Sequence, residues 1–121
     1  MILLDTNALI WADQRHPRAR GLLRAGTALY ISPASLLELQ LLREVGRIRL
    51  RRGLQAIAAD ERWALDEPAG SAWFLRAADL TWTRDPFDRL LAAHVLLRGW
   101  RLATGDGTLL EQLGSDHTIE L

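Results

Sequence analysis

Four carboxylates in this sequence stand where strands are expected to end or helices to begin. Asp5 follows the apolar run Ile2–Leu4, and Asp106 lies on the turn after a second such run. Asp88 falls in the first turn of an expected helix, and Glu38 lies near the start of another. If these side chains converge, their all-oxygen ligation favours one or two Mg²⁺ or Mn²⁺ ions. A metal-activated water at such a site can hydrolyse a phosphodiester.

The rest of the composition supports a divalent cation at this position. Two like charges ~4 Å apart repel by roughly 4 kcal/mol at an effective dielectric constant near 20, so four clustered carboxylates need neutralising. Every basic residue is an arginine, and the chain contains no lysine and no cysteine. The only histidines are His16, His94 and His117, which argues against zinc. The predicted metal ligands, and catalytic residues, are therefore Asp5, Glu38, Asp88 and Asp106.

Three of the four acids also have a purely structural interpretation. Asp5 could serve only as a helix N-cap, and Asp88 only as the acid that complements an N-cap at Asp85. Asp106, between two glycines, is a common turn residue. Glu38 is different because its helical neighbours are small or apolar. These neighbours are Ala34, Ser35, Leu41 and Leu42. A carboxylate on such a face needs a cation or hydrogen-bond donors.

Short apolar runs alternate with helical segments along the whole chain. Strands are predicted at residues 2–4, 28–31, 63–65, 101–103 and 118–119, the last at a sheet edge. Helices are predicted to begin at residue 8 and to cover residues 17–25, 33–45, 54–62, 68–80, 86–98 and 108–113. This order predicts an α/β fold, a three-layer α/β/α sandwich around a central parallel sheet. In such sheets ligands bind beyond the carboxyl ends of the strands.

Length and composition limit the architecture and the setting. The 121 residues fit a single domain, 1–121, and no apolar stretch approaches the ~20 residues that span a bilayer. Asp5 interrupts the first apolar run, so a signal peptide is not expected. The absence of cysteine suits a reducing cytoplasm. The formal charge of zero gives no overall attraction to nucleic acid.

Four segments resemble the motifs of PIN domains, specifically the VapC-type toxins of bacterial toxin–antitoxin pairs. The first is Leu-Leu-Asp5-Thr6-Asn7-Ala-Leu-Ile-Trp, and the second is Ser35-Leu-Leu-Glu38-Leu. The third and most specific is Asp85-Pro86-Phe87-Asp88-Arg89-Leu-Leu-Ala-Ala, and the fourth is Leu102-Ala-Thr104-Gly-Asp106. Their order and spacing fit across essentially the whole chain.

The resemblance implies a Mg²⁺-dependent endoribonuclease that a cognate antitoxin inhibits and that usually forms a homodimer. It carries the acidic set over to Asp5, Glu38, Asp88 and Asp106. Thr104 matches a Ser/Thr position that supports the site by hydrogen bonding, and Thr6 and Asn7 are expected to support it from the first motif. Relatives often carry His, His and Gln at three positions that are Asn7, Thr83 and His94 here, which bears on substrate preference.

The arginines offer candidate contacts to RNA phosphates. Arg84 and Arg89 flank Asp85 and Asp88. The densest basic stretch comprises Arg43, Arg47, Arg49, Arg51 and Arg52. Such a stretch suits phosphate contacts, with Arg43 among the candidates. The alternatives are a solvated face or a docking surface for an acidic antitoxin segment. His94 is interpreted either as a packing residue or as a contact at the rim of the site.

The same residues argue against two other enzyme classes. A haloacid-dehalogenase phosphotransfer domain also begins with a strand and an Asp, but it needs a second Asp where this chain has Asn7, and a lysine. A receiver domain likewise needs a lysine. The remaining alternative is a catalytically weak PIN-fold module that binds protein or RNA. The intact acidic set favours the enzyme, because clustered charge is costly to keep without a cation.

Overall fold

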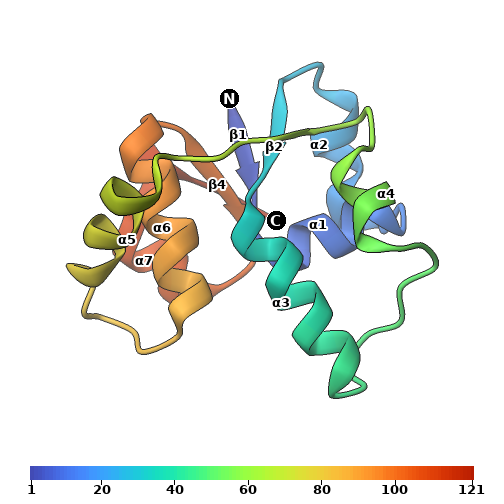
Figure 1. Cartoon of the computed structure of the whole chain (residues 1–121). Coiled ribbons are helices and arrows are strands. Elements are labelled where there is room, and N and C mark those ends of the chain that lie inside the picture. Colours follow the sequence, from blue (N-terminus) through green and yellow to red (C-terminus); the bar gives the residue numbers. More distant parts are fainter.

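A five-stranded, fully parallel sheet forms the centre of the computed structural model, which describes all of residues 1–121 (Figure 1). The strands are β1 (Ile2–Leu4), β2 (Leu29–Ile31), β3 (Ala64–Leu65), β4 (Arg101–Thr104) and β5 (Thr118–Glu120). Their order across the sheet is β3-β2-β1-β4-β5, and each neighbouring pair runs parallel. The predicted parallel sheet is confirmed, with β5 at one edge.

Helices cover both faces of this sheet. They are α1 (Thr6–Asp13), α2 (Arg20–Arg24), α3 (Pro33–Glu44), α4 (Leu54–Ala58), α5 (Gly70–Ala78), α6 (Pro86–Arg98) and α7 (Gly107–Leu113). Short 3₁₀ turns at Pro17–Ala19 and Ser115–His117 precede α2 and β5. In Figure 1, α1, α2 and α4 lie on one side of the strands, and α5, α6 and α7 lie on the other.

Two separate hydrophobic cores show the three layers directly. Alternate side chains of β1 point to opposite faces, as the period of a strand requires. Ile2 and Leu4 therefore pack with α1, α2 and α4, whereas Leu3 packs with α5, α6 and α7. The three-layer α/β/α fold predicted from the sequence is confirmed.

The order in which the chain adds strands to the sheet reverses between β1 and β4. The chain moves outward from β1 through β2 to β3 and then returns to the other side of β1 to form β4. Leu4 and Ala103 are register partners, so the two strands end side by side. In open α/β sheets, the crevice beyond such a switch point is where ligands bind.

Side-chain caps fix where the helices that leave this edge begin. Asp5, Ser32, Asp85 and Asp106 are the N-cap residues of α1, α3, α6 and α7, and each accepts a backbone hydrogen bond from the first turn. Pro33 and Pro86 follow two of these caps at the first helical position. The starts of α3 and α6 agree with the prediction, because the chemistry of an N-cap followed by proline is local.

Several element boundaries differ from the prediction. Helix α1 begins at Thr6 rather than residue 8, and the segment 17–25 divides into a 3₁₀ turn and the short α2. Helix α4 ends at Ala58, because Asp60 accepts a hydrogen bond from the backbone amide of Arg62 instead of continuing the helix. Helix α5 runs over Gly70–Ala78 rather than 68–80. None of the helices is long and apolar enough to cross a membrane.

Candidate active site

A cleft of about 340 Å³ opens at the carboxyl edge of β1 and β4. Its lining contains all four acids singled out in the sequence: Asp5, Glu38, Asp88 and Asp106. They come from the first half of α3 and from the starts of α1, α6 and α7. The structure therefore brings together four residues that are spread over nearly the whole chain.

Asp5 and Asp106 are both helix caps and cleft residues. The Ala8 amide donates to Asp5 Oδ1 at 2.7 Å, and the Leu109 amide donates to Asp106 Oδ1 at 3.0 Å. Each cap engages only one carboxylate oxygen through these bonds. The structural interpretation of the two residues as caps is thus correct, and capping does not exclude a ligand role for either.

Thr104, the last residue of β4, contacts two of the cleft acids. Its side chain is fully buried, and its hydroxyl oxygen accepts a hydrogen bond from the Asp106 amide at 3.0 Å. It also forms a side-chain hydrogen bond with Asp5. Thr104 therefore contacts both acids that follow β1 and β4, and its supporting role stays a prediction.

Glu38 is held by the first turn of α1. The Thr6 hydroxyl donates to Glu38 Oε1, and Ser35 Oγ lies 3.1 Å from Thr6 Oγ1. Thr6 and Ser35 are buried, and Glu38 is half-buried. A buried hydroxyl donor accounts for a carboxylate on an otherwise apolar helix face, as Glu38 was expected to need. Asn7, also in the first turn of α1, lines the cleft with an exposed side chain.

Asp88 has the largest rise in pKa among the four acids. The N-cap Asp85 accepts hydrogen bonds from the amides of Phe87 (2.8 Å) and Asp88 (3.2 Å), which fixes Asp88 in the first turn of α6. Loss of hydration raises the pKa of Asp88 to about 7. The other causes of this rise are the negative charges of Asp85, Asp106, Glu38 and Asp5, in that order.

Burial also raises the pKa of Asp5 and of Glu38. For Asp5 the charge of Asp106 adds to the effect, whereas hydrogen bonds from Thr104 and backbone amides oppose it. For Glu38 the Thr6 hydroxyl opposes the rise, and the charges of Asp85 and Asp5 add to it. The sequence pattern predicts Asp85 only as a cap. Its place three residues before Asp88 was the available signal that it also contributes charge to the cleft.

Comparison with known proteins assigns the fold to a family. The family model described as PIN domain matches residues 2–113. The chain belongs to the PIN domain family. A solved structure titled "Toxin-antitoxin complex from Klebsiella pneumoniae" is similar to this PIN domain over 100% of both chains, with a TM-score of 0.72 and 17% sequence identity. A search of curated protein sequences gives no match.

The donor set of this PIN domain fits a hard divalent cation. PIN domains are generally nucleases and typically use divalent metal ions. The four cleft acids offer only oxygen ligands, and no ion pair with arginine or histidine neutralises any of them. As placed, no three of these side chains surround one point closely enough to ligate a metal. Loss of hydration is the main cause of the raised pKa values of Asp5, Glu38 and Asp88, and the charges of neighbouring carboxylates add to it.

The arginine that lines the cleft is Arg47. Arg47 belongs to the dense basic stretch, but the phosphate contacts predicted from the sequence are Arg43, Arg84 and Arg89. None of those three lines the cleft. Arg43 donates to Gln40 Oε1 at 2.5 Å, and Arg89 donates to the Thr83 carbonyl oxygen at 2.7 Å. The turn that follows α3 folds Arg47 back toward the acids, and local pattern does not reveal that turn's direction.

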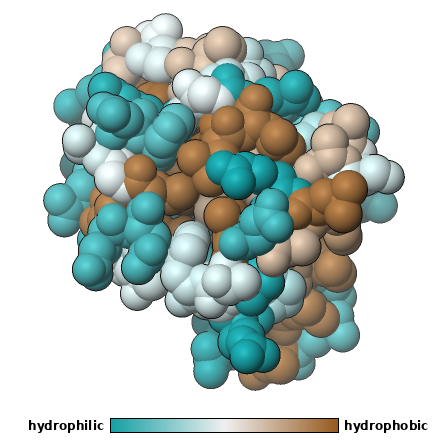
Figure 2. All heavy atoms as spheres, turned by 90° about the vertical axis from the view of Figure 1, so that its left-hand side faces the viewer, coloured by the Kyte–Doolittle hydropathy of each residue, from teal (hydrophilic) through white to brown (hydrophobic).

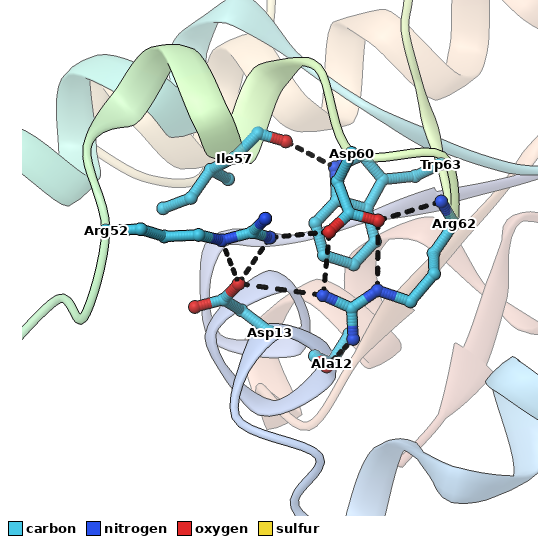
Figure 3. Close-up of polar contacts among 7 residues, drawn as sticks. All are labelled: Ala12, Asp13, Arg52, Ile57, Asp60, Arg62 and Trp63. Atoms are coloured by element: carbon cyan, nitrogen blue, oxygen red, sulfur yellow. Dashed lines mark hydrogen bonds and ion pairs between the residues drawn. The ribbon is translucent and has the colours of Figure 1, made fainter.

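Arg52, from the same basic stretch, is part of an internal ion-pair network (Figure 3). It contacts Asp13 at 2.6 Å and Asp60 at 2.7 Å. Arg62 contacts Asp60 at 2.9 Å and lies 3.7 Å from Asp13. This network ties the end of α1 to the segments before and after α4, so the role of Arg52 is structural.

His94 is a packing residue and does not reach the cleft. Its side chain is fully buried, and its Nε2 lies 2.7 Å from Asp66 Oδ2. Burial lowers the pKa of His94, which favours the neutral ring. Trp73 and Trp100 pack around this ring. Of the two interpretations of His94, the rim contact is wrong.

Proposed function

We propose that this PIN domain is a Mg²⁺- or Mn²⁺-dependent endoribonuclease and the toxin of a VapBC-type toxin–antitoxin pair. The observation that carries the proposal is the cleft itself. Four carboxylates without ion-pair partners line one crevice at the switch point of a parallel sheet, beside a single arginine. This arrangement suits one or two cations and a phosphodiester.

The residues would divide the work between ligation and positioning. Asp5, Glu38, Asp88 and Asp106 would hold the cation or cations. When bound, such a cation supplies a water of lowered pKa and stabilises charge on the leaving oxygen. Thr6 holds Glu38, Thr104 holds the backbone of Asp106, and Asn7 lies at the edge of the cleft. Arg47 is placed to pair with a phosphate, with Arg43, Arg84 and Arg89 as more distant contacts.

The partners proposed are an RNA substrate, a cognate antitoxin and a second copy of the chain, in the cytoplasm. The similar solved structure is titled as a toxin–antitoxin complex, which supports the antitoxin. Exposed apolar side chains support protein partners. Leu41 and Val45 border a groove beside Glu38, and Phe74 and Leu75 are 60% and 69% exposed on α5. Figure 2 faces the α5 side, where apolar patches interrupt the polar surface.

The decisive test is cleavage of a mixed RNA pool with Mg²⁺, with EDTA, and by Asp5→Asn. Asn can still cap α1, since it is as good an N-cap as Asp, but it carries no charge. We expect EDTA or Asp5→Asn to reduce cleavage about a hundredfold or more, with an unchanged circular dichroism spectrum. Asp79→Asn, at the exposed C-terminal end of α5, is the control and should cleave normally. Normal cleavage by Asp5→Asn would overturn the assignment.

The alternative function is a PIN-fold module that binds RNA or protein with little turnover. It would be favoured if the folded, antitoxin-free protein bound Mg²⁺ and RNA but cleaved nothing in the pool. The cluster of carboxylates without ion-pair partners argues for the enzyme, because clustered negative charge is costly to keep without a cation.

A further inference from the structure

A line of arginines leads away from the acidic cleft. Arg47 and Ile48 line the cleft. Further along the same segment, Arg49 and Arg51 line a second cavity. The segment 47–51 contains no acidic residue. A basic surface therefore begins at the lip of the candidate active site and continues outward.

Arg15 joins this second cavity to a third. It follows the end of α1 with a φ of 56°, and it lines both cavities. The third cavity, of about 390 Å³, is lined by Arg15, Arg20, Arg24 and Arg62 together with Leu23. No acidic side chain lines the second or the third cavity.

Most of these guanidinium groups are free to take an external anion. Of the arginines in the two outer cavities, only Arg62 forms ion pairs, with Asp60 and Asp13 (Figure 3). The others make no ion pair within the chain, and on average the chain is neutral. The surplus positive charge of this surface is thus local. We call Arg47, Arg49, Arg51, Arg15, Arg20 and Arg24 the arginine track.

We propose that the arginine track binds the phosphate backbone of the RNA strand on one side of the scissile bond. This inference rests on the proposed function. It explains how the protein would bind RNA on one side of the cleavage site, outside the cleft itself. Guanidinium groups bind phosphates through paired hydrogen bonds, and a row of them suits a ligand with regularly repeated charge. The track would bind the charged phosphates of the backbone and would not distinguish one base from another.

The position of the track favours RNA over an acidic protein segment. Whatever lies along the track and continues past Arg47 enters a cleft lined by four carboxylates. Both ligands are anionic, but an acidic peptide offers this cleft no group on which the proposed reaction acts. An RNA strand would place there the phosphodiester that the proposed metal-dependent reaction acts on.

The test compares two matched double variants in an Asp5→Asn background, which allows binding to be measured without the proposed cleavage. Arg20→Gln/Arg24→Gln removes two track residues on α2, and Arg76→Gln/Arg101→Gln removes two exposed arginines elsewhere. Fluorescence anisotropy would measure affinity for single-stranded RNA across a salt series. We expect the track variant to bind about tenfold more weakly and its salt slope to fall by ~1.4, at ~0.7 per lost phosphate contact. The control variant should match its parent.

Two further arms separate this inference from the proposed function. With Asp5 intact, the track variant should cleave an RNA too short to leave the cleft at the same rate as the wild type, and a long RNA more slowly at low concentration. If the track variant binds RNA with unchanged affinity and unchanged salt slope, the arginine track does not bind RNA, even if the wild type is a nuclease. Competition for the track by polyglutamate but not by RNA would also overturn it, in favour of an acidic protein. Absence of any cleavage would contradict the proposed function, while the binding measurement would still decide the track.

Discussion

The amide of Asp5 donates a hydrogen bond to the carbonyl oxygen of Ala103, at 3.1 Å, just beyond the point where β1 and β4 pair. This bond fixes the first acid against the strand whose next residue, Thr104, holds the backbone of Asp106. Two of the four cleft acids are thus tied to the sheet edge. The other two, Glu38 and Asp88, are carried on α3 and α6. A cation bound by all four would join the sheet edge to both helices.

Divalent cations should therefore stabilise the folded protein. We expect Mg²⁺ or Mn²⁺ to raise the Tm, because a ligand that binds only the folded state at a hundred times its Kd adds about 2.7 kcal/mol. Asp88→Asn removes one proposed ligand and should reduce this gain. Differential scanning fluorimetry with increasing Mg²⁺ would measure it. Asp79→Asn should keep the full gain, and an equal gain in Asp88→Asn would remove Asp88 from the ligand set.

Without metal, the acids should make stability fall as pH rises toward neutrality. The pKa of Asp88 is raised to about 7 from an ordinary value of 3.8, so between these values the folded state binds more protons than the unfolded state. The free energy of unfolding then decreases with rising pH across that window. Allowing for solvent screening of a half-exposed group, we expect a contribution on the order of 1 kcal/mol.

The measurement is urea unfolding in EDTA at about pH 5 and about pH 8. Asp88→Asn should be more stable than the wild type at the higher pH and close to it at the lower pH, because Asn cannot ionise. The quantity to compare is the difference in the free energy of unfolding between wild type and Asp88→Asn. If this difference is the same at both pH values, Asp88 carries no raised pKa.

The layer architecture and the positions of the four acids were predictable because both depend on local patterns. An apolar run such as Ile2–Leu4 identifies a buried strand, and caps such as Asp85 with Pro86 fix where a helix begins. Once the strands are parallel, the residues after β1 and β4 must meet at one edge. The convergence of Asp5 and Asp106 follows from that topology alone.

The features that sequence reasoning missed depend on contacts between distant segments. Arg52 looked like part of a basic patch, but its partner Asp13 belongs to α1. His94 looked equally suited to the rim, but its side chain is fully buried and its Nε2 contacts Asp66, after β3. The path of Arg47 into the cleft depends on the turn after α3. None of these partners is marked by spacing in the chain.

Thr6 should act on catalysis through Glu38. Thr6→Val removes the hydroxyl that donates to Glu38 Oε1 while keeping the shape of the side chain. We expect cleavage to fall about ten- to a hundredfold, as for other groups that orient metal ligands. The free energy of unfolding should change by about 1 kcal/mol or less. Thr6→Ser, which restores the hydroxyl, should recover most of the activity. Equal activity of the Val and Ser variants would show that this hydrogen bond does not position Glu38.

The network around Asp60 should act on stability and leave catalysis unchanged. Asp60 accepts hydrogen bonds from Arg52 and Arg62 and is 12% exposed, so Asp60→Ala leaves two guanidinium groups with Asp13 as their only carboxylate. We expect a loss of about 1–3 kcal/mol in the free energy of unfolding. Glu61→Gln, an exposed neighbour, should have no measurable effect on stability. Chemical denaturation and RNA cleavage, measured on the same samples, would separate the two properties.

The same network gives a pH dependence opposite in sign to that of Asp88. Its arginine partners, chiefly Arg62, hold the pKa of Asp60 well below the ordinary 3.8. The stability that Asp60 contributes is therefore fully present above that value and is lost as the pH falls below it. Wild type and Asp60→Ala should thus differ most near neutral pH and converge under strongly acidic conditions. A difference that persisted unchanged into acid would show that Asp60 acts through packing and not through its charge.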